Sequence, residues 1–512
     1  MSRRALISVY EKAGVGAFAR ALHELDFELV SSGGTAAFLE EQGLPVTRVE
    51  DVTHAPEMLG GRVKTLHPRI HAGILARREL AEDVATLEAH EIEPFDLVCV
   101  NLYPFAAAAG RRGATEAEVV EMIDVGGPSM LRAAAKNFPH VAAVSHEDQY
   151  DLVLAELREH GEVTLDTRRQ LAQEAFQTTA VYEATIANWF GELQKFPDQL
   201  TLPFRKVTEL SYGENPHQAA AYYAEIGARR HLLSRVEQLG GKELSYNNLA
   251  DLEGARRVLR EFALPAFVIV KHANPCGAAV AGTIEEAWER ALAADPVSAF
   301  GCVAIANREI PEELGARIAE HFVEVLMAPG YEDGAVEALR TKKALRILVD
   351  RERRAETPGE RDYKRVLGGL LVQERDADIE DRATMEVATG SVTEQQWGDL
   401  LFAWRVCKHV SSNAIVLARD LQTIGVGAGQ MSRVDAVRIA VEKAREHGHD
   451  LQGAVLASDA FFPFADGPQI ALDAGVNAII QPGGSRRDTE VLDAVAAAGA
   501  AMVVTGRRHF RH

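Results

Sequence analysis

Short apolar runs alternate with longer stretches of helical periodicity along this chain, and this pattern limits what the chain can fold into. Residues 5–9, 97–100, 267–270 and 303–306 are runs of the first kind, and residues 434–444 have a helical repeat. Such alternation is typical of strands that form a largely parallel sheet covered by helices. We therefore predict an α/β protein.

The length and the charge of the chain narrow its class further. A chain of 512 residues exceeds a single ordinary core, so we expect two to four domains. Its 55 lysines and arginines face 75 acidic residues, which gives a formal net charge of -20. Because binders of nucleic acid or of anionic membranes need a positive field, we expect neither kind of partner. No run approaches the ~20 apolar residues that span a bilayer, and the first residues lack a signal-peptide core, so we expect a cytoplasmic protein.

The clearest domain boundary lies between residues 190 and 205. A helical pattern ends there and gives way to LQKFPDQLTLPFRKV, which has two prolines and no sustained period. We predict one domain over residues 1–196 and a larger region over residues 197–512.

The larger region contains a weak internal repeat. Residues 350–395 are rich in charge, which predicts an exposed segment. This segment would connect two halves of about 200–350 and 395–512. The echoes between these halves are Lys271-His272-Ala273-Asn274 with Lys408-His409 and Asn413, and Ser298-Ala299-Phe300 with Asp459-Ala460-Phe461. We interpret the repeat as a duplicated α/β unit whose site lies between the copies.

Two glycine-rich segments of the first domain precede helical patterns. Ser32-Gly33-Gly34-Thr35 is one, and Asp124-Val125-Gly126-Gly127-Pro128-Ser129, with Arg132 and Lys136 downstream, is the other. The free N–H groups and the positive dipole end of a helix N-terminus attract an anion such as phosphate. The alternative for the first segment is an ordinary N-cap with a tight turn.

Polar residues also follow the apolar run 97–100 of the first domain. Asn101 and Tyr103 come directly after it, and the carboxyl ends of strands line the ligand crevice of α/β sheets. The segment GRVKTLHP at 61–68, followed by His71, adds cations, a threonine and histidines suited to a polar anion. His67 and His71 could equally be structural residues, and Tyr103 an ordinary interface aromatic.

In the larger region, the apolar run 266–270 ends abruptly in Lys271 and His272. A lysine beside a histidine at the end of a buried strand would keep the imidazole neutral and able to act as a base near pH 7. Neighbouring strand residues point to opposite faces, so both reach one site only if a turn begins at this pair. The alternative is a strand that ends in solvated polar residues.

Four further segments are less specific. Residues 424–430 have glycines spaced GxGxG, which is not the GxGxxG dinucleotide fingerprint. The phenylalanines of residues 461–464 could stack on a flat heterocycle or lie in the core. Residues 483–487 offer another anion site, and residues 507–512, taken alone, predict a frayed basic tail.

Taken together, these segments are far more specific than any one of them. The chain contains, in order, GRVKTLHPRIHAGILARR, NLYPF, IDVGGPSMLRAAAKN, YGENPHQ, KELSYNN, VKHANPCGAAV, SAFG, SSNAIVLA, IGVGAGQMSR, SDAFFPF and QPGGS. Over essentially its whole length it closely resembles the family of bifunctional phosphoribosylaminoimidazolecarboxamide (AICAR) formyltransferase/IMP cyclohydrolases.

The resemblance implies both a fold and two reactions. The first domain would have a methylglyoxal-synthase-like fold and close N-formyl-AICAR to IMP with loss of water. The larger region would hold two cytidine-deaminase-like α/β units and move a formyl group from 10-formyltetrahydrofolate, the cosubstrate, to the 5-amino group of AICAR. The resemblance further implies a homodimer with transformylase sites at the subunit interface, and no required metal.

The resemblance also assigns roles to matched positions. The catalytic positions are Lys271 and His272 for formyl transfer, and Lys64, Tyr103, Asp124 and Lys136 for ring closure. The substrate-binding positions are Ser8, Lys12, Ser32, Gly34, Thr35, Arg62, Thr65, Asn101, Tyr212, Asn248, Gly301, Asn413 and Arg508. The positions on the folate side are Phe461, Asp466 and Ser485.

The chain departs from the family pattern at two positions. Ser211 stands where family members usually carry a phosphate-binding arginine before the YGENPHQ loop, which puts the AICAR affinity in doubt unless a cation such as Arg507 compensates. Tyr10 replaces the small residue that is typical between Ser8 and Lys12.

Two other functions compete with this assignment. A zinc-dependent nucleoside deaminase needs an HxE pair and PCxxC ligands, but Ala273 and Asn274 follow His272, and Cys276 has no partner three residues on. A nucleotide-sensing protein that kept the scaffold without catalysis would be recognised by its lack of turnover.

Overall fold

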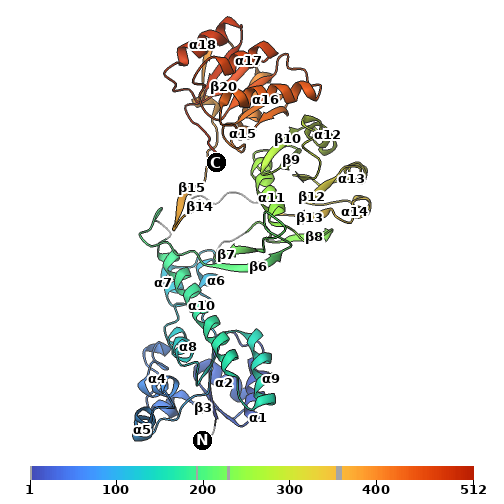
Figure 1. Ribbon diagram of the computed structural model, residues 1–512. Coiled ribbons are helices and arrows are strands. Elements are labelled where there is room, and N and C mark those ends of the chain that lie inside the picture. The colour runs from blue at the N-terminus through green and yellow to red at the C-terminus, as the bar shows by residue number, and fades with distance from the viewer. Residues whose placement is uncertain (1–2, 192–193, 228–230, 353–359) are drawn as a thin grey trace. The chain divides into compact units, whose positions relative to one another are not determined.

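The computed structural model describes residues 3–191, 194–227, 231–352 and 360–512, which form two compact units (Figure 1). The first unit comprises Met1–Arg205 and Ala224–Arg229, and the second comprises Lys206–Tyr223 and Arg230–His512. The two strands β6 (Phe204–Leu210) and β7 (Ala220–Glu225) form a small sheet of their own at the change from one unit to the other in the sequence.

The first unit is built on a five-stranded sheet with the order β3-β2-β1-β4-β5. All its pairings are parallel, so the carboxyl ends of its strands meet at one edge. The strands are β1 (Arg3–Ser8), β2 (Phe27–Ser31), β3 (Thr47–Arg48), β4 (Leu97–Val100) and β5 (Ala142–Val144).

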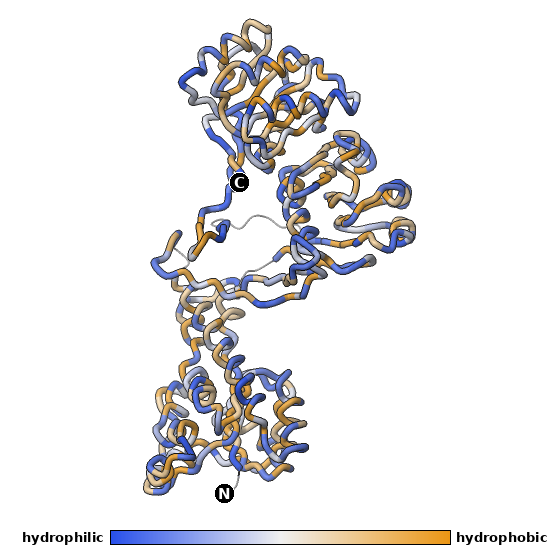
Figure 2. The backbone as a smooth tube through the Cα atoms, in the orientation of Figure 1, coloured by the Kyte–Doolittle hydropathy of each residue, from blue (hydrophilic) through white to orange (hydrophobic). Residues whose placement is uncertain are grey.

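Helices cover both faces of this sheet. Ala5 and Ile7 of β1 pack into one apolar cluster, whereas Leu6 between them packs into another on the opposite face. Figure 2 shows how hydrophobic and hydrophilic residues alternate along the backbone. The helical segments are α1 (Val15–Glu24), α2 (Gly33–Glu41), α3 (Val49–Thr53), η1 (Leu59–Gly61), α4 (Pro68–Leu75), α5 (Ala81–Ala89), α6 (Phe105–Ala109), α7 (Glu116–Val120), α8 (Gly126–Lys136), η2 (Glu147–Gln149), α9 (Tyr150–His160) and α10 (Leu165–Phe190).

The second unit is built on one twelve-stranded sheet with the order β16-β21-β20-β19-β17-β18-β10-β9-β11-β12-β13-β8. Its strands are β8 (Val236–Gly240), β9 (Ala266–Lys271), β10 (Asn274–Val280), β11 (Cys302–Ala306), β12 (Val323–Ala328), β13 (Arg346–Asp350), β16 (Glu386–Thr389), β17 (Ile415–Arg419), β18 (Gln422–Gly427), β19 (Val455–Ser458), β20 (Ala478–Gln481) and β21 (Ala501–Val504).

The strand order makes the sheet a duplicated unit. Each half runs from an antiparallel edge strand through three parallel strands to an antiparallel hairpin, which is β9-β10 in the first half and β17-β18 in the second. The halves meet where β10 pairs with β18 at Ala279 and Gln422. The two halves of the sheet therefore share one strand order.

The individual sequence echoes, in contrast, are wrong. The hairpin turn at Lys271–Asn274 is matched in the second half by the turn from Arg419 to Gln422. Lys408 and His409 instead follow the end of a helix, and Ser298 precedes a strand whereas Asp459 follows one. Short sequence identities misplaced the repeat because topology, rather than residue identity, is what the two halves share.

Helices cover both faces of the large sheet as well. One apolar cluster joins α11 and α15 on the face that both halves share, and the opposite face has a separate cluster in each half. The helices are α11 (Tyr246–Leu259), α12 (Ile284–Ala294), α13 (Glu312–Ala319), α14 (Asp333–Arg340), α15 (Glu394–Cys407), α16 (Arg433–Glu446), α17 (Asp466–Ala474) and α18 (Asp488–Ala497).

The charged segment between the halves contains more structure than an exposed loop. The hairpin of β14 (Arg361–Val366) and β15 (Gly369–Glu374) is largely exposed, as predicted, and η3 (Arg382–Thr384) follows it. Residues 353–359 lie outside the described residues. Strand β16 of the same segment, however, forms an edge of the large sheet.

Candidate active sites of the two units

In the first unit, predicted residues gather at the carboxyl edge of the parallel sheet. Ser8 ends β1, Ser32 directly follows β2, and Asn101 directly follows β4. The Asn101 side chain accepts from the backbone N–H of Tyr10 at 2.5 Å and donates to the carbonyl of Glu11 at 2.9 Å. Asn101 therefore holds the loop that follows β1.

The glycine-rich segment Ser32–Thr35 adjoins that loop. The Thr35 hydroxyl donates to the Val9 carbonyl at 2.8 Å and accepts from Lys12 Nζ at 3.2 Å. Burial lowers the pKa of Lys12 from its ordinary value. The Ser32 side chain is buried, and its hydroxyl has no hydrogen-bond partner among the described residues. A ligand group that reached this hydroxyl would complete its hydrogen bonding.

Lys64 and Asp124 complete this group. A Cβ on Gly33 would lie 3.0 Å from Lys64 Nζ, so the ammonium reaches the glycine-rich turn. Asp124 precedes α8, and its carboxylate accepts from the N–H of Gly127 at 2.8 Å. Burial raises the pKa of Asp124, and the nearby Lys64 charge partly opposes this rise.

Tyr103 lies beside these charges. Burial raises the pKa of Tyr103, and the negative charge of Asp124 adds to the rise, so the phenol stays protonated near pH 7. The Tyr10 ring, which is the departure from the family pattern, lies 5.4 Å from the Tyr103 ring between centroids. The arrangement supplies a cation, a carboxylate and a phenol donor at one sheet edge.

Other predicted residues of this unit differ in their surroundings. Thr65 is buried next to Gly126, since a Cβ there would lie 2.8 Å from the Thr65 hydroxyl. The exposed Arg62 forms an ion pair with Glu121. Lys136 is the last residue of α8, about 15 Å along the helix from Gly126 by the helical rise, so one chain does not bring it to Asp124.

The two histidines near this site differ in their surroundings. His67 is the N-cap of α4, and its Nδ1 accepts from the N–H of Arg69 at 3.2 Å. Burial lowers the pKa of His71, whose Nε2 has no partner within the described part of the chain.

In the second unit, β9 ends at Lys271 and β10 begins at Asn274, so His272 and Ala273 form a two-residue hairpin turn. Lys271 and His272 can reach one site only if a turn begins at this pair, and the hairpin turn does begin there. Lys271 Nζ donates to the carbonyl of the buried Gly301 at 2.6 Å, while the His272 side chain is exposed. The turn thus presents an imidazole to solvent beside a fixed ammonium group.

Asn413 belongs to the second half, close to this turn. The N–H of Ser411 donates to Asn274 at 2.8 Å, which joins the turn to the loop before β17. Asn413 accepts from Arg433 at 2.8 Å, and Arg433 forms a buried ion pair with Asp459. Arg433 and Asp459 were not singled out for this site, because nothing in the sequence shows that they pair.

Two predicted binding residues of the first half differ in the use of their side chains. Asn248 is buried, forms a capping box with Ser245 and donates to Glu324 at 3.0 Å. Tyr212 accepts from the N–H of Tyr246 through its backbone carbonyl at 3.1 Å. The exposed Ser211, which replaces the usual arginine, donates from its hydroxyl to the Leu244 carbonyl at 3.4 Å.

The residues matched to the folate side lie on the second half. Phe461 follows β19 and is 38% exposed, and Asp466 begins α17, where it accepts from the N–H of Gly467 at 2.8 Å. Ser485 follows β20 and accepts from the N–H of Arg487 at 3.1 Å. An exposed aromatic ring is suited to stacking on a flat heterocycle.

The segment 507–512 is held in place, so the frayed tail predicted from these residues alone is wrong. The N–H of His509 donates to the Asp459 carbonyl at 3.0 Å, and the Arg511 carbonyl accepts from the N–H of Ser412 at 2.9 Å. Arg508 lies over the Phe510 ring at 4.6 Å and is otherwise exposed. Arg507 pairs with Asp378, so its charge is already partnered.

Comparisons with known proteins support a single assignment. Residues 134–443 match the family described as "AICARFT/IMPCHase bienzyme", and residues 14–129 match the "MGS-like domain". The chain belongs to the AICARFT/IMPCHase bienzyme family. The predicted methylglyoxal-synthase-like fold of the N-terminal domain and the mixed α/β region after it are thereby confirmed.

Relatives of the same length carry one name. The chain is 49% identical over 516 residues to "Bifunctional purine biosynthesis protein PurH" of Anoxybacillus flavithermus, with 100% of both chains covered. Proteins of that name from Persephonella marina and Neisseria gonorrhoeae are 47% and 49% identical, with 100% of this chain and 100% and 99% of theirs covered. A solved structure, "Crystal structure of ForH", is 37% identical with a TM-score of 0.33, and the match covers 37% of this chain and 100% of that chain.

As a member of the AICARFT/IMPCHase bienzyme family, the chain is a bifunctional enzyme of purine biosynthesis with formyltransferase and cyclohydrolase activities, and the family uses a folate cosubstrate. Within the described ranges, no group of three or more His, Cys, Asp or Glu side chains is placed to hold a metal ion. No helix in the same ranges is long and apolar enough to cross a bilayer.

Proposed function

We propose that the two units divide the two reactions of the family. The second unit transfers a formyl group from 10-formyltetrahydrofolate to the 5-amino group of AICAR, and the first unit closes the product, N-formyl-AICAR, to IMP. The observation that carries the proposal is the turn at Lys271 and His272, where two consecutive residues supply a fixed ammonium and an exposed imidazole at the end of β9.

In the formyl transfer, His272 acts as the base. The amino nitrogen of AICAR attacks the formyl carbon while the His272 imidazole takes the amine proton. A new carbon–nitrogen bond forms, the bond from the formyl carbon to the folate nitrogen breaks, and that nitrogen receives a proton. Lys271, held by the Gly301 carbonyl, stabilises the negative charge on the formyl oxygen.

The remaining residues of the second unit bind the two substrates. We assign AICAR to Tyr212, Asn248, Gly301, Asn413 and Arg508, and the folate to Phe461, Asp466 and Ser485. The buried ion pair of Arg433 and Asp459 supports Asn413, because Arg433 donates directly to the Asn413 side chain. The buried Asn248 would act through the fold around the site, since its side chain already has internal partners.

In the ring closure, the reacting groups belong to one molecule, so the first unit mainly holds the carboxamide nitrogen against the formyl carbon. Lys64 and the protonated Tyr103 stabilise the tetrahedral oxyanion as the carboxamide nitrogen bonds to the formyl carbon, and Asp124 moves a proton. The bond from that carbon to the former formyl oxygen then breaks, and the oxygen leaves as water with one proton from the carboxamide nitrogen and one from the formamide nitrogen. The buried hydroxyl of Ser32 and the cation of Lys12 offer the phosphate a polar cradle, to which we also assign Ser8, Gly34, Thr35, Arg62, Thr65 and Asn101.

The proposal extends to the assembly and the conditions of the reaction. We propose a homodimer in the cytoplasm that needs no metal ion. Because Lys136 lies at the far end of α8 from Asp124 within one chain, its proposed part in ring closure needs a second copy.

The test follows both reactions in one purified chain. AICAR with 10-formyltetrahydrofolate should give IMP, and the rate should not change in EDTA. His272→Ala should lower formyl transfer by about 10²–10⁴-fold and leave the cyclisation of supplied N-formyl-AICAR intact, whereas Lys64→Ala should impair only the cyclisation. Loss of both activities in either folded variant would contradict the division of labour.

A further inference from the structure

The turn that carries the proposed base has an unusual backbone. His272 and Ala273 both have positive φ, at 52° and 61°, and neither is glycine. A two-residue hairpin turn of this kind requires positive φ at both central positions, which glycine and asparagine meet most readily. A non-glycine residue persists in this region only when its surroundings hold it there.

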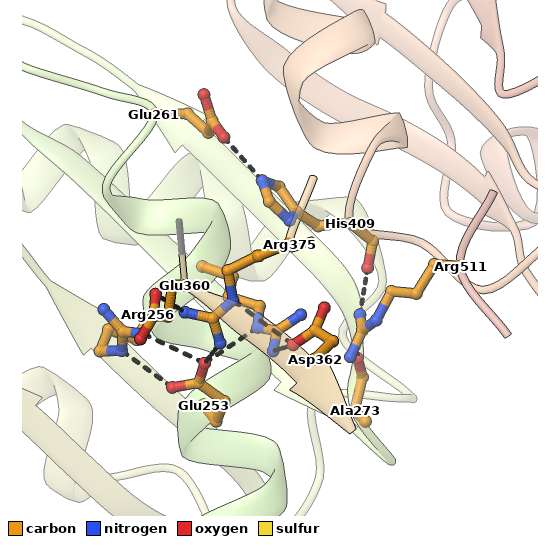
Figure 3. A network of polar contacts seen from close by, with 10 residues as sticks. Glu253, Arg256, Glu261, Ala273, Glu360, Asp362, Arg375, His409 and Arg511 are labelled. Carbon is orange, nitrogen blue, oxygen red and sulfur yellow. Dashed lines mark hydrogen bonds and ion pairs between the residues drawn. The ribbon is translucent and has the colours of Figure 1, made fainter. Parts of the chain in front are cut away.

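Two charged side chains hold the backbone of Ala273. Its N–H donates to Asp251 Oδ1 at 2.5 Å. Its carbonyl accepts from Arg511 at 3.0 Å, as Figure 3 shows. The same guanidinium donates to the carbonyl of His409 in the second half. Both polar groups of the residue next to His272 are therefore bound by side chains from α11 and from the segment 507–512.

The equivalent turn of the second half shows which of these contacts is general. There Asp420 and Leu421 have positive φ, and the N–H of Leu421 donates to Asp399 Oδ1 at 2.7 Å. The Leu421 carbonyl, however, accepts from the N–H of Val280 in strand β10 at 2.9 Å. The aspartate recurs in both halves, but the guanidinium contacts differ. Arg511 binds the carbonyl of Ala273, the second turn residue, whereas Arg290 binds the carbonyl of Asp420, the first residue of the other turn.

We propose that Asp251 and Arg511 are positioning residues for formyl transfer, which together hold the Ala273 peptide and thereby fix the direction of the His272 side chain. The inference rests on the proposed function of His272. Since a general base must reach the amine proton within hydrogen-bond distance, a turn that can relax loses the productive geometry while the substrates still bind.

The loop before β17 also contacts the turn and the segment that carries Arg511. The Asn274 side chain donates to the His272 carbonyl at 3.1 Å and accepts from the N–H of Ser411 at 2.8 Å. The N–H of Ser412 in turn donates to the Arg511 carbonyl. The turn, the loop before β17 and the segment 507–512 therefore support one another around the exposed imidazole.

The experiment compares Asp251→Ala with its matched control, Asp399→Ala, which removes the same contact from the turn without the Lys-His pair. For Asp251→Ala we expect kcat for formyl transfer to fall by about 100-fold with KM for AICAR nearly unchanged, as a small misplacement of a reacting group does. Asp399→Ala should transfer formyl groups within about twofold of the parent chain. Cyclisation of supplied N-formyl-AICAR should be unchanged in both.

Graded variants separate positioning from folding. Asp251→Asn keeps an acceptor oxygen and should recover part of the lost kcat, while Arg511→Ala should lower kcat by about tenfold and Arg511→Lys by less. The loss should extend over the whole range from pH 6 to 9, because the geometry of the turn has changed. Circular dichroism and thermal unfolding report whether each variant is folded.

Three outcomes would overturn the inference: equal kcat losses in Asp251→Ala and Asp399→Ala, parent-like kcat in folded Arg511→Ala, or a loss confined to one side of the pH profile. If Asp251→Ala does not fold, the Arg511 variants still test whether the Ala273 contacts position His272. If the parent chain transfers no formyl group, or His272→Ala retains transfer, the proposed function itself fails, and that result is distinct from the others.

Discussion

The two halves of the twelve-stranded sheet have the same strand order and the same aspartate-held hairpin turn, yet they present different residues there. The first turn carries Lys271 and His272, and the second carries Arg419 and Asp420. The fold thus provides a turn of fixed geometry twice, and the residues placed on it decide whether it can do acid–base chemistry.

A second difference concerns histidine. Glu261 lies two residues after the end of α11, and His409 lies two residues after the end of α15. The spacing in the sequence between Glu261 and His409 equals the spacing between Asp251 and Asp399. These equivalent positions pair with each other, since His409 Nε2 lies 2.8 Å from Glu261 Oε1 (Figure 3). His409 is therefore buried and structural, whereas His272 is exposed in the turn to which we assign formyl transfer.

The largest change in the formyl-transfer rate should come from replacing the histidine of the first turn with alanine. His272→Ala removes the proposed base and should lower formyl transfer by about 10²–10⁴-fold. Asp420→Ala, at the same position of the other turn, should leave the rate within about twofold. Steady-state assays with both substrates measure the contrast, and a similar loss in both variants would show that the halves share the chemistry.

The buried histidine should make stability depend on pH. Burial lowers the pKa of His409 to about 4. Between the ordinary histidine value of about 6.5 and pH 4, the unfolded chain binds more protons than the folded one, so stability falls as the pH falls, by on the order of 3 kcal/mol. His409→Gln, which can still donate to Glu261, should lose less stability over this window.

Urea unfolding at pH 6.5 and 4.5 measures this prediction. The interval stays above the titration of Glu261. Burial raises the pKa of Glu261, but the hydrogen bond from His409 and the charge of Lys408 outweigh it and hold this pKa at about 2. His272→Ala is the matched control, since its imidazole is exposed and should not alter the acid sensitivity. If the control and His409→Gln behave alike, the assignment of the sensitivity to burial is wrong.

Two glycines should test whether the halves are packed alike. A Cβ on Gly277 would lie 2.0 Å from the Ala291 carbonyl, and one on Gly425 would lie 2.2 Å from the Ala440 carbonyl. Each glycine lets a helix approach its strand closely, so Gly277→Ala and Gly425→Ala should each cost about 1–3 kcal/mol of unfolding free energy.

Gly398 provides the control for this pair. It lies within α15, where an added Cβ would meet only an ordinary contact at 3.8 Å, so Gly398→Ala should not destabilise the chain. Denaturant midpoints of the three variants give the comparison. A large cost at only one of the two strand positions would mean that the halves differ in packing.

The smallest effect should come from Arg419, the counterpart of Lys271. Arg419 pairs with Asp450 at 3.0 Å and is 39% exposed, so Arg419→Ala should change the unfolding free energy by less than about 1 kcal/mol. Formyl transfer should be unaffected. Lys271→Ala in the same assay should show a strong loss, and the two results together separate catalytic charge from surface charge.

Local patterns predicted much of this architecture. Alternation of apolar runs identified the α/β class, and the positions of Asn101 and Tyr103 after an apolar run placed them at the sheet edge, because strand ends can be recognised from neighbouring residues. The turn at Lys271 was predicted as a condition on backbone direction, and the hairpin register meets that condition.

Contacts between distant residues could not be predicted in this way. The approach of Arg511 to Ala273 and of Asp251 to the same peptide depends on how β9, α11 and the segment 507–512 come together, and no local period encodes it. The repeat was recognised, but its residue-by-residue match was wrong, since topology survived where identity did not. The residue roles carried over from the family stay predictions.

The joint between the halves has a consequence for dynamics. Strands β10 and β18 pair in register only at Ala279 and Gln422, whereas β9 and β17 are each paired along their length with two neighbours. Amide protons at the joint should therefore exchange with deuterated solvent sooner than those of β9 and β17. The sheet is continuous, but its two halves should unfold as separate cooperative units, and the β10–β18 pairing should open first.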